Sequence, residues 1–328
     1  MSEHPFAALS PDLVLNAVES LGLLSDARIM PLNSYENRVY QVGIEEQAPV
    51  IAKFYRPERW TNAQILEEHA FTAQLADCDV PVVQPLIFDQ QSLFEFEGYR
   101  FALFPRQGGY APEPGNLEQL YRLGQLLGRM HAVGASHKFK HRHSLNVQTY
   151  GIKARQTLLD SHFIPKKLQA DWEKASAQLV EKVSHIMRQR PYQAIRIHGD
   201  CHPGNLLYRD EAFFIVDLDD SKTGPAVQDF WMLLEGSYEE RCQQISELIE
   251  GYQEFCDFDY AQLHLIESLR ALRMLSYSAW LALRWSDPAF PKYFPWFTSE
   301  QYWYDQLLAL RTQIKTLEEP ALRLANLI

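Results

Sequence analysis

The chain has 328 residues, of which 46% are hydrophobic and 22% charged, a composition typical of a globular protein and not of a disordered one. Acidic residues outnumber basic ones by 42 to 31, and the net charge of -11 argues against nucleic acid or an anionic membrane as a partner. The four cysteines form no close pair and neither a signal peptide nor a long uncharged apolar run is visible, so we expect a soluble, cytoplasmic protein with reduced thiols.

The first hundred residues carry short strand-like and helical patterns. A helix is predicted to begin at Pro11 with Ser10 as its N-cap and to end at Gly22. Runs of β-branched and aromatic residues predict strands, and Glu97-Gly98 is a two-residue hairpin signal. The further elements expected here are strands at 38–44 and 50–55, a helix at about 62–75, and a hairpin of 93–96 with 99–104.

The pattern changes after a linker that is rich in glycine and proline, at 107–115. A helix is expected at 117–133, and most of the remaining chain is helical in pattern except for residues 194–219. We therefore predict an α+β fold with two lobes, a small β-rich N-lobe at 1–104 and a larger, mainly helical C-lobe at 105–328. Nothing in the sequence requires a partner chain, so we expect a monomer.

The segment 195–220 carries the residues best suited to chemistry, because two apolar strand-like pieces deliver polar side chains at their ends. Asp200 precedes Asn205 with four residues between them, the spacing of a kinase catalytic loop with an Asp base and a metal-binding Asn. Asp217 follows an apolar strand, where a metal-binding carboxylate is expected, and Asp219 is a candidate additional ligand. Phosphoryl transfer needs this set, since a hard Mg²⁺ takes oxygen ligands and neutralises the phosphoryl oxygens.

A positive partner for the phosphates of ATP has to come from elsewhere in the chain. Lys53 ends the strand-like run Val-Ile-Ala-Lys, and Glu68 on the following helix is its expected ion-pair partner. Each signal alone has an ordinary explanation, such as a capping Asp200 or a solvated loop at 217–220. Their order along the chain, from strand Lys to strand Asp, favours a kinase with ATP and Mg²⁺ as cofactors.

The stretches HGDCHPGN (198–205) and IVDLDD (215–220) resemble those of the aminoglycoside phosphotransferase and choline kinase-like family, whose fold is protein kinase-like. The resemblance implies that the loop holding Ser34 covers the phosphates, although residues 33–37 contain no glycine. It also implies that adenine meets the backbone near Phe104 and Arg106, that the "PV" at 81–82 marks Glu68 and not Glu67, and that Asp229 braces the catalytic loop.

A narrower resemblance is to bacterial serine/threonine protein kinases of this fold that act in stress protection. It is carried by PLNSYENRVYQ, KFYRPERW, GPAVQDFWMLL and RWSDPAFPKYFPW. The resemblance implies a protein substrate with a Ser or Thr acceptor. Only a short segment separates Asp217 from Asp229, so control by phosphorylation of a long activation loop is not expected.

The residues by themselves leave the acceptor open. A small hydroxylated or cationic molecule, such as an aminoglycoside or choline, is the alternative to a protein, and a nucleotide-binding scaffold without turnover is a third possibility. Nine acids against one base at 235–267 fit either a docking surface for a cationic partner or a solvated helix face. The aromatic run at 280–297 fits either a cleft wall or core, and the basic cluster at 138–143 is interpreted as a solvated loop.

Overall fold

The computed structural model of the protein describes residues 4–325, which form two compact units. Unit 1 contains the residues up to Pro112 together with Phe139–Arg142 and His202–Ser221. Unit 2 contains Glu113–Lys138, His143–Cys201 and the residues from Lys222 onward. These units group residues by contact and not by chain order, so the predicted division after residue 104 stays a prediction.

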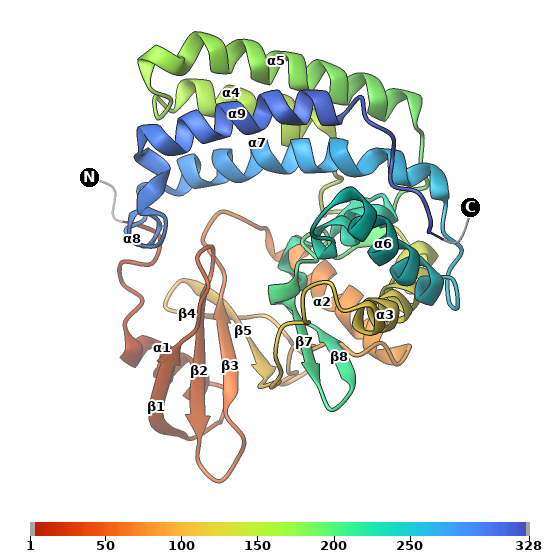
Figure 1. Ribbon diagram of the computed structural model, residues 1–328. Coiled ribbons are helices and arrows are strands. Elements are labelled where there is room, and N and C mark those ends of the chain that lie inside the picture. The colour runs from red at the N-terminus through yellow and green to blue at the C-terminus, as the bar shows by residue number, and fades with distance from the viewer. Residues whose placement is uncertain (1–3, 326–328) are drawn as a thin grey trace. The chain divides into compact units, whose positions relative to one another are not determined.

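Unit 1 is built on an antiparallel sheet of five strands in the order β1-β2-β3-β5-β4 (Figure 1). The strands are β1 (Ser25–Pro31), β2 (Arg38–Ile44), β3 (Val50–Phe54), β4 (Phe94–Phe96) and β5 (Tyr99–Pro105). The unit also contains the helices α1 (Pro11–Glu19) and α2 (Asn62–Asp77), and a hairpin of β7 (Leu206–Arg209) and β8 (Ala212–Ile215). Strand β3 lies between two neighbours, so its side chains are held in the middle of the sheet.

The two faces of the sheet in unit 1 are both covered, and this decides where β3 presents its polar residue. Ala52 and Phe54 belong to the core that α1 closes, because alternate residues of a strand point to the same face. Lys53 therefore points to the opposite face, where Tyr55 packs with Ile65 of α2. The sheet thus buries a single lysine on the α2 side.

Most of the elements expected in unit 1 are confirmed. The Ser10 side chain accepts a hydrogen bond from the Leu13 backbone N–H and caps α1. Glu97 and Gly98 both have positive φ values, 49° and 78°, as a tight two-residue hairpin requires. Strand β1 was not predicted from the sequence. Its pairing with β2 shifts register between Ser25 and Ile29, and Ala27 has φ 62°, so this edge strand lacks the regular alternation that would indicate a strand.

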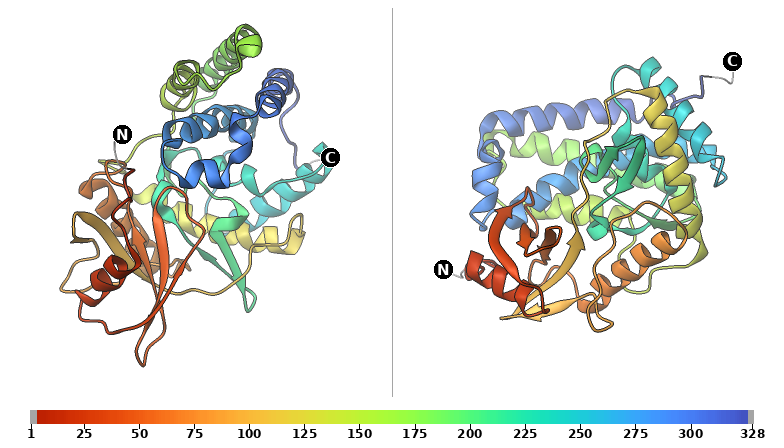
Figure 2. Two further views of the ribbon diagram at one scale, coloured as in Figure 1. Left: turned by 90° about the vertical axis from the view of Figure 1, so that its left-hand side faces the viewer. Right: turned by 90° about the horizontal axis from the view of Figure 1, so that it is seen from below.

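Unit 2 is mainly helical, as predicted, and Figures 1 and 2 show α4, α5, α7 and α9 lying alongside one another. The helices α3 and α6 pack closely: a Cβ added at Gly124 of α3 would lie 2.0 Å from the Leu248 carbonyl oxygen. Part of the aromatic run at 280–297 forms core, since Phe290 and Phe297 are fully buried, whereas Trp280 is half-buried and Trp296 is 40% exposed. The α-helices of unit 2 other than α8 are α3 (Leu117–Ser136), the short α4 (Ala154–Asp160), α5 (Lys166–Gln189), α6 (Tyr238–Tyr252), α7 (Ile266–Arg284) and α9 (Glu300–Thr316).

Shorter elements connect these helices. None of the helices within residues 4–325 has the length and apolar character needed to cross a membrane. The short elements of unit 2 are a π-helix η1 (Gln148–Lys153), the paired strands β6 (Ile195–Ile197) and β9 (Lys222–Gly224), the 3-10 helices η4 (Ala226–Asp229), η5 (Trp231–Leu233), η6 (Tyr260–Leu265) and η7 (Pro295–Thr298), and α8 (Ala289–Tyr293).

Candidate active site

Lys53 is the buried cation at the centre of the site in unit 1. Its ammonium Nζ lies 2.8 Å from Asp217 Oδ1 and 3.4 Å from Asp219 Oδ1. Burial by itself would lower the pKa of Lys53, but the two carboxylates hold that pKa well above its ordinary value. The side chain therefore stays charged at any physiological pH, although only 6% of the residue is exposed.

Glu68 lies on α2, is also buried, and has a different environment from the one expected. The ion pairs of Lys53 within the described residues go to Asp217 and Asp219, and the expected pair with Glu68 is not among them. Burial raises the pKa of Glu68 to about 7, since the positive charge of Lys53 offsets only part of the desolvation. Its Oε2 atom has no hydrogen-bond partner among residues 4–325.

The neighbouring His69 is a neutral structural group. Its ring nitrogens lie 2.8 Å from the Tyr55 hydroxyl and 2.8 Å from Ser92 Oγ. Burial, together with the positive charge of Lys53, lowers the pKa of His69 to about 3. The histidine therefore does not take part in proton transfer near neutral pH.

The β7–β8 hairpin brings the two predicted metal ligands to the same open end. Leu206 pairs with Ile215, so Asn205 and Val216 stand opposite each other, and the Val216 N–H donates to the Asn205 carbonyl oxygen at 3.1 Å. Asp217 comes next, with φ 57° in the left-handed region, a costly conformation for a non-glycine residue that occurs often at functional sites. The Asp217 side chain remains 53% exposed and free to take a ligand in addition to Lys53.

Asp219 is the hub of a buried charge cluster that the sequence did not reveal. Its carboxylate binds the Arg59 guanidinium and accepts a hydrogen bond from Asn37 Nδ2 at 3.2 Å. Burial would raise the pKa of Asp219, but Lys53 and Arg59 hold it below the ordinary value. The only signal for Arg59 in the sequence was its place in KFYRPERW.

Arg142 departs from the interpretation of the basic cluster at 138–143 as a solvated loop, which holds for the exposed Lys138, Lys140, His141 and His143. Only 6% of Arg142 is exposed, and its guanidinium donates to the backbone carbonyls of Asp219, Ser221 and Gln64. Glu67 holds the same loop, because its carboxylate accepts the backbone N–H groups of residues 140–142. The sequence showed the charges but not the carbonyl groups that bind them.

The loop between β1 and β2 is held without glycine. Ser34 Oγ donates to the Asn37 carbonyl oxygen at 3.3 Å, and Asn37 Oδ1 accepts the Arg56 backbone N–H at 3.1 Å. Side-chain hydrogen bonds therefore fix the loop that carries Ser34. Phe104 lies at the end of β5 with 9% exposure, and Arg106 follows with Nε donating to Gln41 Oε1 at 2.8 Å, so a role of either residue in nucleotide binding stays a prediction.

Asp200 belongs to unit 2 and follows β6. The backbone N–H groups of His198 and Gly199 both donate to the buried Asp229 carboxylate at 2.8 Å, which confirms that Asp229 braces this loop. His131 of α3 donates to the same carboxylate at 3.0 Å; burial would raise the pKa of Asp229, but these hydrogen bonds keep it below the ordinary value. The Asp200 carboxylate itself lies 2.5 Å from the Arg273 guanidinium.

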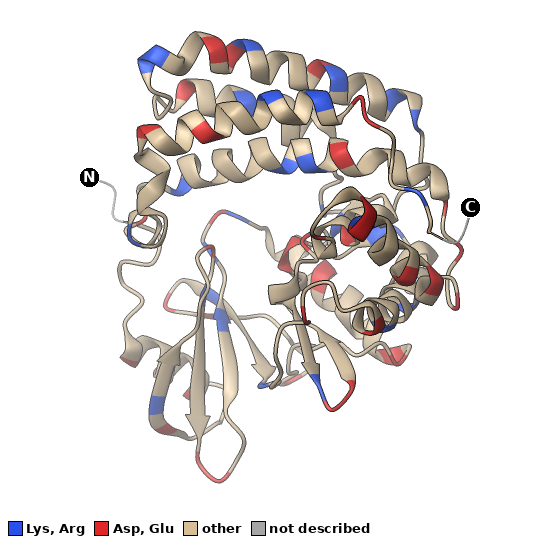
Figure 3. Ribbon diagram, viewed as in Figure 1, with Lys and Arg blue, Asp and Glu red and all other residues tan. Residues whose placement is uncertain are grey.

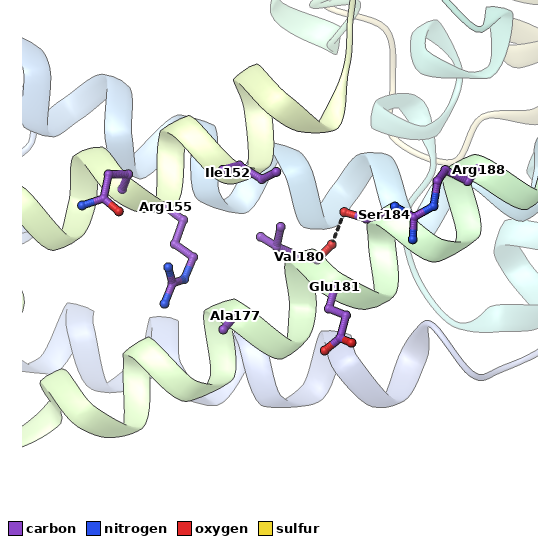
Figure 4. Close-up of a pocket in the computed structure, with 8 residues that line it drawn as sticks. Ile152, Arg155, Ala177, Val180, Glu181, Ser184 and Arg188 are labelled. Atoms are coloured by element: carbon purple, nitrogen blue, oxygen red, sulfur yellow. Dashed lines mark hydrogen bonds between the residues drawn. The ribbon is translucent and has the colours of Figure 1, made fainter.

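A pocket of about 400 Å³ lies elsewhere in unit 2 (Figure 4). Arg155 on its wall donates to Ser176 Oγ at 2.9 Å and is thereby held in place. None of the predicted site residues lines this pocket, so we assign it no part in the active site. The lining residues are Ile152, Arg155, Gln156, Ala177, Val180, Glu181, Ser184 and Arg188.

Residues 28–266 match the model of the phosphotransferase enzyme family, and the chain belongs to that family. Its activity is thus that of a kinase, an ATP-dependent phosphotransferase. The chain is similar to stress response kinase A of Escherichia coli (strain K12), with 46% identity over 323 residues that cover 98% of both proteins. It is also similar to serine/threonine protein kinase RdoA of Salmonella typhimurium, with 44% identity over 319 residues and 97% of both.

Solved structures share the fold at low sequence identity. Amicoumacin kinase hAmiN, in complex with AMP-PNP, Ca²⁺ and Ami, has a TM-score of 0.73 at 18% identity and covers 95% of this chain and 94% of its own. The microcompartment-associated aminopropanol kinase has a TM-score of 0.66 at 19% identity, with 92% and 96% covered. These similarities confirm the predicted kinase-like α+β fold.

Proposed function

We propose that the protein is a serine/threonine protein kinase of the stress response that uses ATP as phosphoryl donor and Mg²⁺ as metal cofactor. The observation that carries the proposal is the ion pair of 2.8 Å between Lys53 and Asp217, which lie 164 positions apart in the chain. A buried strand lysine beside a carboxylate at the end of a hairpin is the pair that kinases use for phosphates and metal. In this proposal the Lys53 ammonium binds phosphate oxygens of ATP.

The residues at the open end of the β7–β8 hairpin fit a magnesium ion. Asn205 and Asp217 offer an amide and a carboxylate oxygen, and Mg²⁺ takes one or two such protein ligands with water and phosphates completing its shell. The buried Asp219 Oδ1 accepts no hydrogen bond within the described residues and lies 3.4 Å from the Lys53 ammonium, and it is the candidate for a further oxygen ligand. When bound, the ion would neutralise charge on the phosphate oxygens.

Asp200 is the proposed general base. It would orient the acceptor hydroxyl and take its proton as the phosphoryl group transfers. Its loop is held through Asp229 by two backbone hydrogen bonds, which limits the positions that the carboxylate can adopt. Only five positions of chain separate Asp200 from Asn205, a span of at most about 18 Å.

The remaining predicted contacts concern the ends of the nucleotide. Ser34 would meet the phosphates with its hydroxyl and backbone N–H, and Glu68 would orient Lys53. The adenine edge would meet the backbone between Phe104 and Arg106. Pro105 has no N–H, so the Arg106 N–H is the available backbone donor after Phe104.

The name of the relative at 44% identity, serine/threonine protein kinase RdoA, supports a protein acceptor, and a cytoplasmic monomer is part of the same proposal. The small-molecule alternative has support of its own, because solved structures with this fold are named kinases of amicoumacin and aminopropanol. The acceptor is therefore the feature that the first experiment has to decide.

The test is transfer of labelled phosphate from ATP by the purified chain with Mg²⁺. The acceptors are dephosphorylated casein, choline and an aminoglycoside. We expect transfer to serine and threonine of the protein, and a loss of about 10²- to 10⁴-fold in rate for Asp200→Asn. Asp217→Asn should weaken the binding of Mg²⁺, so a titration of the metal would show half-maximal activity at a higher Mg²⁺ concentration than in the wild type.

Asp210→Asn is the matched control, because Asp210 lies at the exposed tip of the same hairpin and its side chain is 87% exposed. Its activity should equal that of the wild type. Transfer to choline or the aminoglycoside alone would exclude the protein acceptor. Nucleotide binding without transfer to any acceptor would indicate a scaffold without turnover.

A further inference from the structure

Arg273 contacts the proposed base but was not predicted to be part of the site. It lies on α7, and its Nη1 atom is 2.5 Å from Asp200 Oδ1 within unit 2. The two side chains are 39% and 24% exposed, so the pair is open to solvent. Ion pairs with this degree of exposure add little to stability, and stability alone therefore does not explain a cation at this carboxylate.

The chemistry of the guanidinium indicates which ligand it can take. Arginine keeps its charge at all physiological pH values and offers five N–H donors in a planar fork. One nitrogen contacts Asp200 and 39% of the side chain is exposed. A guanidinium is suited to a carboxylate or a phosphate, which it can bind through two parallel hydrogen bonds. A quaternary or primary ammonium group at the same place would meet a like charge.

We propose that Arg273 selects the acceptor: it binds an anionic group next to the acceptor hydroxyl and disfavours cationic acceptors. This inference rests on the proposed function, because it takes Asp200 as the base that receives the acceptor hydroxyl. When the hydroxyl lies at Asp200, its neighbouring groups lie beside the Arg273 guanidinium. The acceptor class is then a serine or threonine beside glutamate, aspartate or a phosphorylated residue.

The face of α7 that carries Arg273 is suited to bind a peptide segment. Tyr277 and Trp280 follow Arg273 at four and seven positions, so all three lie on one side of the helix, and all three are half-buried. The rings of Tyr277 and Trp280 lie 5.6 Å apart at 34°. Figure 3 shows that basic residues stand on this helix, and the face thus combines a cation with an aromatic wall.

Several carboxylates of the acidic stretch at 235–267 already have hydrogen-bond or ion-pair partners within unit 2. Fewer of them are therefore available to bind a cationic acceptor than the composition indicates. Glu240 closes a capping box at the start of α6. Glu254 accepts hydrogen bonds from Tyr121 and Gln125 of α3, and Glu267 pairs with Arg241 at 3.3 Å. The charge that faces the proposed base from α7 is positive.

The experiment compares three peptides of the same length, each with one central serine flanked by glutamate, glutamine or lysine. The rate of labelled phosphate transfer gives kcat and KM for each peptide. For the wild type we expect kcat/KM to fall from the glutamate to the lysine peptide by at least about tenfold, mainly through KM, since like charges repel in the bound state. Arg273→Gln should reduce the difference to within about threefold, and Arg273→Glu should reverse the order.

Arg270→Gln is the control for charge on the same helix, because Arg270 lies one turn earlier and pairs with Glu267 at 3.3 Å. It should keep the preference of the wild type. Equal kcat/KM values for the three peptides in the wild type would overturn the inference while leaving the protein kinase activity intact. If Arg273→Gln raises kcat/KM equally for all three peptides, the inference is also overturned, because Arg273 would then only block access to the Asp200 carboxylate.

Small alcohols separate this inference from the proposed function. If no peptide is phosphorylated but glycerate is preferred over choline, the protein acceptor is excluded and the role of Arg273 is supported. If no peptide is phosphorylated and choline is preferred over glycerate, both the protein acceptor and the role of Arg273 are excluded. The folding of each variant is checked by thermal unfolding, so that a loss of structure is not read as a loss of selectivity.

Discussion

Asp219 in unit 1 and Asp200 in unit 2 are both carboxylates in contact with arginine, but their surroundings differ. Asp219 is 2% exposed and binds Arg59 and Lys53, whereas the Asp200 side chain is 24% exposed and pairs with Arg273. A buried carboxylate among cations cannot lose its charge without leaving those cations unpaired. A half-exposed pair can exchange partners with water or a ligand at small cost. The first arrangement thus fixes the shape of a site, and the second is suited to admit a substrate.

The largest expected change in the free energy of unfolding comes from removing the buried carboxylate of Asp219. Asp219→Ala would leave the Lys53 and Arg59 charges buried with one partner fewer each. We expect it to lower the free energy of unfolding by about 3–5 kcal/mol, as for other broken buried ion pairs. Chemical denaturation of the wild type and the variant measures this.

The exposed Asp210 provides the matched control for that change. Asp210→Asn should alter the free energy of unfolding by no more than about 0.5 kcal/mol, because the side chain is 87% exposed and asparagine tolerates the left-handed φ of 50° at this position. A loss of less than about 1 kcal/mol for Asp219→Ala would mean that the buried cluster does not hold unit 1 together, and the comparison would fail.

The buried Glu68 is tested through the pH dependence of the free energy of unfolding. Its pKa rises from an ordinary 4.5 to about 7 on folding, so the folded chain binds this proton more tightly and loses stability as pH rises through that range. Glu68→Gln removes the penalty, and its stability relative to the wild type should increase by up to about 3 kcal/mol between pH 4.5 and 8. His69 has the opposite pH dependence but is present in both proteins, so its effect cancels in the difference.

The adjacent Glu67 provides a second test, because folding lowers its pKa whereas folding raises the pKa of Glu68. Desolvation opposes its charge, but backbone N–H groups of residues 140–142 hold the pKa of Glu67 below its ordinary value. Its contribution to stability is present above pH 4.5 and is lost as the pH falls through the lowered pKa. Glu67→Gln should therefore be most destabilising at neutral pH, where Glu68→Gln is most favourable. Parallel pH profiles for the two variants would contradict both assignments.

The smallest expected change in the free energy of unfolding comes from removing the partly exposed ion pair of Arg273 with Asp200. Arg273→Gln should change the free energy of unfolding by less than about 1 kcal/mol, because a half-exposed ion pair is worth little in water. The same variant is expected to lose the charge preference for acceptors. A large loss of stability would show that the Arg273–Asp200 pair is structural and would remove the contrast with Asp219.

Much of unit 1 could be predicted because its signals are local. The Ser10 cap, the Glu97-Gly98 turn and the strand predicted at 50–55, which the structure has at 50–54, each depend on a few neighbouring residues. Asp217 could be placed at the end of a strand for the same reason. Strand β1 could not, since an exposed edge strand with an irregular register carries no clear alternation.

The sequence by itself determined which residue types are present for phosphoryl transfer and on which elements they stand. Only the tertiary structure decided their partners: Lys53 pairs with Asp217 and not with Glu68, and Arg142 is buried against carbonyl groups. The physical reason is that an ion pair or a buried donor is satisfied by whichever group folding brings near it. That group lies tens to hundreds of positions away, where no local periodicity records it.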